Sequence, residues 1–157
     1  MLVVRPARPA DIADISTVLI SSITELCVED HASDPKRIAD WTANKSPQGI
    51  AQMLERPAFS MFVAELDQRI AAVGATTAEG EIALNYVAPS ARFQGVSKAL
   101  LAHMEADLRS KGFAEARLKA TRTARPFYLA QGWAGSGTAQ GGRFIDCFVM
   151  HKALNQR

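Results

Sequence analysis

The stretch RFQGVSKALL, residues 92–101, combines residue types that can bind a phosphate group at the start of a predicted helix. The first backbone N–H groups of a helix have no partner within it and lie at the positive end of the peptide dipole, so they attract anions. Gly95 and the small Ser97 leave these groups uncovered, while Arg92 and Lys98 add positive charge. The stretch therefore predicts a pyrophosphate site, although a glycine here can also do no more than ease a turn.

Two other phosphate-binding patterns are absent. No GK[ST] ends the loop, which excludes a P-loop, and the lack of GxGxxG excludes the dinucleotide fingerprint. The net charge of +2 is too small to indicate nucleic acid or an anionic membrane as a partner. Any anion site must therefore be local.

A second stretch, ATRTARPFYLAQGW at residues 120–133, places Phe127 beside Tyr128 on another predicted helix. An aromatic pair on an amphipathic helix, taken alone, is expected to pack in the core. Without further context this stretch therefore predicts core packing.

The first stretch resembles the acetyl-CoA-binding motif of the Gcn5-related N-acetyltransferase (GNAT) family. That motif reads Gln or Arg, two residues, Gly, one residue, then Gly or Ala. Arg92 and Gly95 occupy the first two places, and Ser97 stands where the family has the last small residue. Phe93 stands where members often have glycine. The approach LNYVAPSARFQG, residues 84–95, is similar to the family's strand that leads into the motif.

The second stretch resembles a later motif of the same family, an aromatic-Tyr pair on a short helix followed by Gly and an aromatic residue. Thr121 replaces an asparagine that is often found there, which affects one expected side-chain contact to the cofactor. The matching residues are Ala124, Phe127, Tyr128, Gly132 and Trp133.

The resemblance implies a single domain over residues 1–157 with the GNAT fold. This is a mixed α/β (α+β) fold with a largely antiparallel central sheet, flanked by helices and splayed between strands 4 and 5. It also implies acetyl-CoA as co-substrate, with the pantetheine arm added as a strand along the sheet edge and the pyrophosphate on the helix start. The implied cofactor-binding residues are Asn85, Tyr86, Val87, Arg92, Phe93, Gln94, Gly95, Val96, Ser97, Lys98, Thr121, Ala124, Phe127 and Tyr128.

The implied activity is direct transfer of an acetyl group to a primary amine in a ternary complex, without an acyl-enzyme. Tyr128 is the implied general acid for the leaving thiolate, and the backbone N–H near Tyr86 or Val87 could stabilise the oxyanion. Glu81 lies eleven residues before Arg92, where histone-type members carry a base, but it could equally be a charged residue at a strand start. A transferase for a longer acyl-CoA and a non-catalytic CoA-binding or sensing module remain alternatives.

The acceptor, either a small molecule or a peptide amine, would bind near ELCVEDHASDPKRIADWTANK, residues 25–45. Carboxylates outnumber cations in this segment, which suits a cationic acceptor, although such charges are usually a solvated face. Trp41 either lines the pocket or packs in the core, and packing is favoured. His31 is a second candidate base, but a lone loop histidine is expected to be exposed. The acidic residues are Glu25, Glu29, Asp30, Asp34 and Asp40.

Secondary structure that could position these residues follows from hydrophobic periodicity. The residues at 12, 15, 19, 23 and 26 form one face of a helix, and 96, 100, 104 and 108 form another within a helix from about 94 to 111. Shorter helices are expected at 34–44, 47–56 and 123–131. Strands are expected at 2–5, 60–66, 69–77, 81–87 and 114–120, with a terminal hairpin of 132–138 and 143–153 turning at 139–142.

Composition suggests a cytoplasmic globular protein of 157 residues, because the N-terminus lacks the apolar core of a signal peptide and no run could span a bilayer. Cys27 and Cys147 are expected to be reduced. Their spacing to histidines suggests no metal site. The basic run at 109–125 could meet the 3′-phosphate of CoA or only water, and nucleic acid is the least favoured partner. A homodimer remains open.

Overall fold

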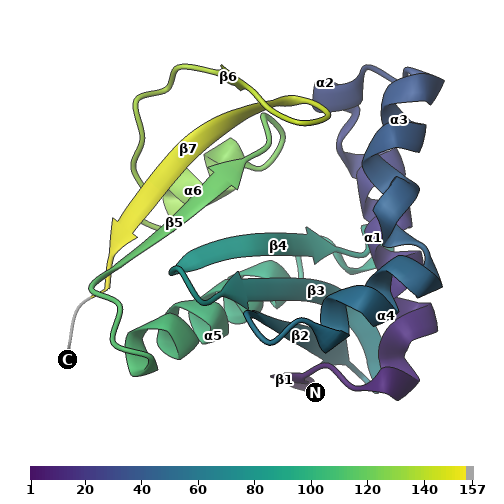
Figure 1. Ribbon diagram of the computed structural model, residues 1–157, viewed down its shortest axis with the longest axis horizontal. Coiled ribbons are helices and arrows are strands. Elements are labelled where there is room, and N and C mark those ends of the chain that lie inside the picture. The colour runs from purple at the N-terminus through teal and green to yellow at the C-terminus, as the bar shows by residue number, and fades with distance from the viewer. Residues whose placement is uncertain (155–157) are drawn as a thin grey trace.

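A seven-stranded sheet runs through the computed structural model, which describes residues 1–154 (Figure 1). The strand order is β1-β2-β3-β4-β5-β7-β6, and neighbours are antiparallel except for β4 and β5. The predicted mixed α/β fold with a largely antiparallel sheet is confirmed. The strands are β1 (Leu2–Pro6), β2 (Phe59–Leu66), β3 (Arg69–Thr77), β4 (Glu81–Val87), β5 (Glu115–Ala120), β6 (Gln140–Gly141) and β7 (Asp146–Ala153).

Helices cover both faces of the sheet because its central strands are apolar on both sides. In β2, Phe62 and Ala64 pack with α5, whereas Met61 and Val63 pack with α1 and α4. Adjacent side chains of a strand point to opposite faces, so α5 lies across the sheet from α1 and α4. The helices are α1 (Ile12–Leu26), α2 (Val28–His31), α3 (Pro35–Thr42), α4 (Pro47–Glu55), α5 (Val96–Ser110) and α6 (Arg125–Ala130), with short 3₁₀ turns η1 (Pro9–Asp11), η2 (Ala43–Lys45) and η3 (Pro89–Ala91).

The expected splay between the fourth and fifth strands is present. β4 and β5 are parallel, and only Glu81 and Ile82 of β4 pair, with Arg117 and Leu118 of β5. Beyond Ile82 the two strands diverge toward their C-terminal ends, as the teal and green arrows in Figure 1 show. The edge of β4 that faces β5 is therefore left without a strand partner over most of its length.

A β-bulge in β4 determines which face its side chains reach. Ala75 pairs with Leu84 and Thr76 with Ile82, so Ala83 is the extra residue in β4. As a result, Ile82 packs with the cluster around α5, while Leu84 packs with the cluster around α1 and α4.

The predicted strand at 132–138 does not form. In this segment only Ala134 pairs with β7, as an isolated bridge to His151, and the first strand of the hairpin is instead β6, where a turn was expected. Gly132 and Gly137 adopt positive φ, which interrupts an extended strand. Gly135 lies so close to β7 that a Cβ atom would be 2.5 Å from the carbonyl oxygen of Val149. These glycines therefore form a loop across β7.

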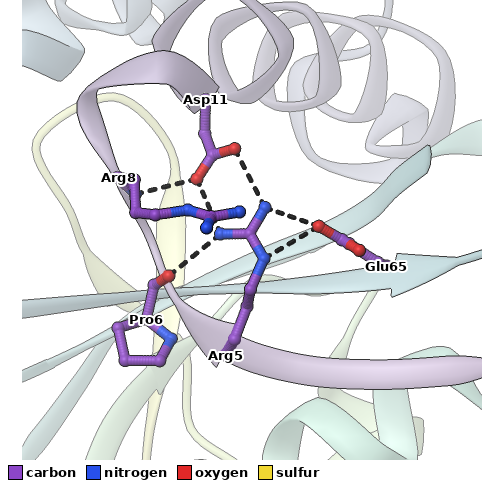
Figure 2. Close-up of polar contacts among 5 residues, drawn as sticks. All are labelled: Arg5, Pro6, Arg8, Asp11 and Glu65. Atoms are coloured by element: carbon purple, nitrogen blue, oxygen red, sulfur yellow. Dashed lines mark hydrogen bonds and ion pairs between the residues drawn. The ribbon is translucent and has the colours of Figure 1, made fainter. Parts of the chain in front are cut away.

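A cluster of charged side chains fixes the start of α1 against the first two strands (Figure 2). The guanidinium of Arg5 donates to both carboxylate oxygens of Asp11, at 2.8 and 3.0 Å, and also to Glu65 of β2. Asp11 accepts a further bond from the backbone N–H of Arg8. The guanidinium of Arg5 holds the pKa of Asp11 below its usual value, so this carboxylate stays ionised and in place.

Replacing Asp11 with asparagine is expected to lower the free energy of unfolding at pH 7 by about 2 kcal/mol, a typical loss for hydrogen bonds to a charged group. Because the folded-state pKa of Asp11 is depressed, its stabilisation is complete above the unfolded pKa of about 4 and is lost as the pH falls below it. The difference in the free energy of unfolding between wild type and variant, measured by urea denaturation, should become smaller as the pH is lowered. Asp67, whose ion pair with the N-terminus is exposed, is the matched control, and its Asn variant should be unchanged. A gap independent of pH would contradict the prediction.

Candidate active site

A cavity of about 240 Å³ lies where β4 and β5 diverge. Six parts of the chain line it: the C-terminal end of α1 with Cys27, residues 82–87 of β4, the loop before α5, the end of β5, the β5–α6 loop and the start of α6. The predicted cofactor-binding residues among its lining are Asn85, Tyr86, Val87, Arg92, Phe93, Thr121, Ala124, Phe127 and Tyr128.

Tyr128 lines this cavity and carries a protonated hydroxyl group. Its side chain is 5% exposed, and burial raises its pKa to about 12, so the hydroxyl keeps its proton at neutral pH. The side-chain amide of Asn85 donates a hydrogen bond of 2.9 Å to the hydroxyl oxygen. Since that oxygen accepts from Asn85, its own hydrogen can be donated elsewhere. The sequence suggested only a backbone role for Asn85, although an amide within the apolar run of β4 was a signal for a side-chain role.

Aromatic packing and a buried carboxylate hold Tyr128 in position. Its ring makes edge-to-face contacts with Phe127 and Trp133, with centroids 5.4 and 5.8 Å apart. The indole N–H of Trp133 donates to Glu105 of α5, which also accepts from Lys152 of β7. The helix that carries Tyr128 is thus tied to both α5 and the sheet.

Thr121, which replaces the family's asparagine, stabilises the start of α6. Its hydroxyl oxygen accepts a hydrogen bond of 3.0 Å from the backbone N–H of Ala124. The neighbouring Thr123 has another partner, because its N–H and hydroxyl both donate to Asp30 of α2. Asp30 also accepts a 2.6 Å bond from the N–H of Arg122, so α2 is joined to the β5–α6 loop beside the cavity.

The start of α5 offers free backbone donors next to the cavity. Gly95 precedes the helix with φ of 79°, and a Cβ atom there would meet nothing within 4 Å. The first bond of the helix runs from the N–H of Ala99 to the carbonyl of Gly95. The N–H groups of Val96, Ser97 and Lys98 donate to no acceptor among residues 1–154. In this part of the chain only Arg92 and Phe93 line the cavity, so Gln94, Gly95 and the three residues with free N–H groups lie just outside it.

Phe93 has an unusual conformation for a large apolar residue. It is 92% exposed and adopts a φ of 64°, a region that favours glycine. The guanidinium of Arg92 stacks on its ring, 4.6 Å from the centroid. Glycine, which the family often has here, would adopt this backbone without strain. The aromatic ring thus forms an exposed rim of the cavity.

The sequence model described as "Acetyltransferase (GNAT) domain" matches residues 27–154 of this chain. The chain belongs to the GNAT acetyltransferase family. Among curated proteins, none matches the sequence significantly. Solved GNAT structures share the fold at low sequence identity.

A structure described as a GCN5-related N-acetyltransferase: Aminotransferase, Class-II, from Rhodopseudomonas palustris has a TM-score of 0.85 and 20% identity, covering 97% of this chain and 95% of its own. The PaiA N-acetyltransferase of Thermoplasma acidophilum, solved with coenzyme A, has a TM-score of 0.83 and 19% identity, covering 98% and 99%. The yncA structure, a putative acetyltransferase from Salmonella typhimurium with acetyl-CoA, has a TM-score of 0.66 and 15% identity, covering 100% and 96%. At these identities the likeness shows the fold alone.

Glu81 is not part of the lining of the cavity between β4 and β5 in this GNAT chain. It begins β4 at the closed end of the splay, where it pairs with Arg117. It lines a neighbouring depression together with Glu79, Arg117, Leu118, Lys119 and Val149, of which Leu118 and Lys119 also line the cavity between β4 and β5. The structure therefore does not bring Glu81 together with Tyr128.

Ser22 and Leu26 of α1, together with Cys27 directly after this helix, form the opposite wall of the cavity. Burial, with a smaller effect of Asp30, raises the pKa of Cys27 to about 12, so its thiol is not ionised at neutral pH. Burial likewise raises the pKa of Tyr86. This wall of the GNAT cavity thus carries no ionised side chain, which argues against Cys27 as a nucleophile.

His31 is fully buried, which corrects the expectation that it is exposed. One ring nitrogen lies 2.8 Å from the carbonyl oxygen of Ile23, and the other accepts from the N–H of Ser33. Both ring nitrogens are thus engaged, one with α1 and one with the loop after α2, which removes His31 as a candidate base. Trp41 is 4% exposed and packs against Ile23 and Cys27, as favoured from the sequence.

Three of the five carboxylates in the acidic segment at 25–45 have hydrogen-bond or ion-pair partners. Asp30 binds the β5–α6 loop, as described above. Asp34 caps α3 and lies 3.8 Å from Arg37, and Asp40 pairs with Lys36. These contacts favour the solvated-face interpretation over a cationic acceptor site.

Within residues 1–154 no helix is long and apolar enough to cross a membrane. No group of three or more potential metal-ligating side chains occurs in the same part of the chain. Both cysteines are free thiols.

Proposed function

We propose that the protein transfers an acetyl group from acetyl-CoA to a primary amine by direct attack in a ternary complex. The observation that carries this proposal is the protonated Tyr128 hydroxyl in the cavity between β4 and β5, beside an open helix start. A thioester held in this cavity would have a proton donor within it and phosphate ligands at its rim. Membership of the GNAT family supports this reaction class.

The cofactor would use groups that the fold leaves unpaired. The N–H groups of residues 95–98 would bind the pyrophosphate, with positive charge from Arg92 and Lys98. The pantetheine arm would add along Asn85, Tyr86 and Val87, because the pairing of β4 with β5 ends at Ile82. The PaiA structure holds coenzyme A and the yncA structure holds acetyl-CoA, which supports the same cofactor here.

The chemistry then follows from the residues around the thioester. A neutral amine attacks the thioester carbonyl, and a backbone N–H of Tyr86 or Val87 stabilises the oxyanion. When the tetrahedral intermediate collapses, the C–S bond breaks and the sulfur takes the proton of Tyr128. Asn85 stabilises the resulting phenolate through its 2.9 Å hydrogen bond. Tyr128 then regains, through water, the proton that the attacking amine has lost.

We propose that water, and not Glu81, takes the proton of the attacking amine, because Glu81 lies at the closed end of the splay. The Glu81→Gln variant is expected to keep kcat within about twofold of wild type, with an unshifted pH–rate profile. Glu79→Gln, from the same depression but outside the lining of the cavity between β4 and β5, is the matched control for loss of a carboxylate at this end. A Glu81→Gln profile whose acidic limb moves or disappears would restore Glu81 as the base.

The proposed function is tested by thiol release from acetyl-CoA with a panel of small primary amines and amine-terminated peptides. We expect release that depends on both substrates, with intersecting initial-rate patterns and no acetylated protein in mass spectra of the quenched enzyme. Competition with propionyl-CoA and butyryl-CoA tests the longer-acyl alternative. Binding of CoA without thiol release from any amine would favour the non-catalytic module.

A further inference from the structure

The cavity between β4 and β5, where the proposed function places the thioester, is called the acetyl-CoA cavity. A second cavity, of about 350 Å³, adjoins its wall and is lined mainly by polar side chains. Three arginines from segments far apart in the sequence converge there: Arg37 of α3, Arg122 of the β5–α6 loop and Arg143 of the β6–β7 loop. We call it the arginine cavity. Figure 1 shows the β6–β7 loop reaching across to α2 at the top of the molecule. The rest of the lining is Glu29, Asp30, Ala32, Gly142, Phe144, Ile145 and Asp146.

The two cavities share the same pieces of chain. In the first helices, Cys27 lines the acetyl-CoA cavity, and Glu29 and Asp30 line the arginine cavity. In the β5–α6 loop, Thr121 and Thr123 line the former and Arg122 the latter. Residues one or two positions apart have Cα atoms within about 7 Å. A molecule that extends a few bonds beyond the reacting amine could therefore contact both cavities.

The apolar residues between the cavities give such a molecule a continuous wall. Phe144 and Ile145 of the β6–β7 loop pack with Tyr86 against the cluster of Ile23, Cys27 and Trp41. Tyr86 and Cys27 line the acetyl-CoA cavity, and Phe144 and Ile145 line the arginine cavity. The wall itself carries no charge.

Of the three carboxylates that line the arginine cavity, only Asp30 is firmly hydrogen-bonded, and the guanidinium groups are only loosely paired. Asp30 accepts three hydrogen bonds from the β5–α6 loop. Arg122 lies 3.9 Å from Asp146 and Arg37 lies 3.8 Å from Asp34, both near the limit of an ion pair. Within residues 1–154, no carboxylate lies within 4 Å of the guanidinium of Arg143. Glu29 is the one lining carboxylate without a hydrogen-bond or ion-pair partner in that range.

Lys45 is a second, buried cation whose charge is felt by Arg143. Lys45 is 5% exposed, and within residues 1–154 its ammonium donates only to the side chain of Asn44, at 2.7 Å. Burial, with a further contribution from the charge of Arg143, lowers the pKa of Lys45 to about 8. An anion bound beside Arg143 would stabilise both cations.

We propose that the arginine cavity binds an anionic group, a carboxylate or a phosphate, of the amine acceptor, so that the preferred acceptor carries an anion several bonds from its reacting amine. The inference rests on the proposed function, because the acetyl-CoA cavity supplies the reacting end. It also replaces the cationic acceptor suggested by the acidic segment at 25–45. Arginine suits this role because its planar fork can bind either anion with two hydrogen bonds.

The test uses amide chemical shifts of the full chain saturated with CoA, which fills the phosphate site at residues 95–98. Inorganic phosphate and sodium acetate are titrated separately at constant ionic strength. One or both should cause saturable shifts in residues 142–146 and at Arg37, and the Arg143→Gln variant should raise the Kd at least fivefold. Arg69→Gln, an exposed arginine on β3, should leave the Kd unchanged. Glu29→Gln should tighten binding, since it removes the competing carboxylate.

Three outcomes would overturn the inference: no saturable shift, a Kd unaffected by Arg143→Gln, or shifts at 142–146 that appear with CoA alone and then block phosphate. The last would assign the arginine cavity to the cofactor. Phosphate response without acetate response indicates a phosphorylated acceptor, and the reverse indicates a carboxylate.

A kinetic experiment separates this inference from the proposed function. Phosphoethanolamine is compared with ethanolamine, and β-alanine and γ-aminobutyrate with their primary amides. In each pair that the enzyme acetylates, the amine that carries an anionic group should have at least a tenfold lower KM than its uncharged counterpart. Arg143→Gln should raise the KM of the anionic amine with little change in kcat. Equal KM values within the pairs would overturn the inference and leave the proposed function intact. Absence of thiol release with any amine would instead overturn the proposed function, while the phosphate titration would still report on the anion site.

Discussion

Replacing Tyr128 with phenylalanine is expected to lower kcat by about two to three orders of magnitude, the range in which a general acid contributes. The variant loses only the hydroxyl group, so the edge-to-face packing against Phe127 and Trp133 is retained. The Kd for acetyl-CoA should change less than about threefold, because the phosphate and pantetheine contacts lie elsewhere. Initial rates and calorimetric titration measure the two quantities.

The pH dependence sharpens this prediction. Burial raises the pKa of Tyr128 to about 12, so the wild-type hydroxyl stays protonated through the range of an assay. No alkaline fall in kcat should therefore come from Tyr128 below about pH 11. Asn85→Ala removes the only side-chain donor to the hydroxyl oxygen within residues 1–154, and should lower kcat less than Tyr128→Phe does. Unchanged kcat in Tyr128→Phe would exclude the general-acid role.

A glutamate at position 95 is expected to weaken acetyl-CoA binding at least a hundredfold, about 2.7 kcal/mol. Space at Gly95 is open, so the side chain fits sterically, but its carboxylate would lie before the free N–H groups of Val96, Ser97 and Lys98. It would occupy these donors and repel the pyrophosphate.

The chain offers a matched control for backbone strain. Gly112 follows the other end of α5 with φ of 93°, and a Cβ atom there also meets nothing within 4 Å. Gly112→Glu adds the same strain and charge to the same helix away from the phosphate site. Gly95→Ala adds strain without charge. Equal losses of affinity in Gly95→Glu and Gly112→Glu would show that strain, and not an occupied phosphate site, causes the effect.

Local patterns in the sequence predicted the elements that carry the site. The apolar residues four positions apart from Val96 onward fixed the buried face of α5, and Gly95 marked its start within two residues of the predicted position. Alternating and apolar runs predicted β2, β3 and β4, because these strands follow one another along the chain with short turns. The family motifs then identified the residues around the splay.

Contacts between distant residues were not predictable in this way. The side chain of Asn85 meets Tyr128 because the β4 bulge and the packing of α6 bring them together across 43 positions. Asp30 was interpreted as part of an acidic surface, but it accepts hydrogen bonds from Arg122 and Thr123, which are distant in the sequence. The burial of His31 depends on α2, a single turn of four residues that hydrophobic periodicity cannot reveal. The arginine cavity likewise exists only once α3 and two loops converge.

Hydrogen–deuterium exchange with and without saturating acetyl-CoA tests the central claim most directly, because the proposed phosphate ligands are backbone N–H groups. The N–H groups of Val96, Ser97 and Lys98 have no acceptor within residues 1–154, so they should exchange rapidly in the free protein. The account predicts that acetyl-CoA slows exchange in residues 85–98 and leaves β1 and β2 unchanged. No slowing at residues 85–98, or slowing confined to another part of the chain, would contradict it.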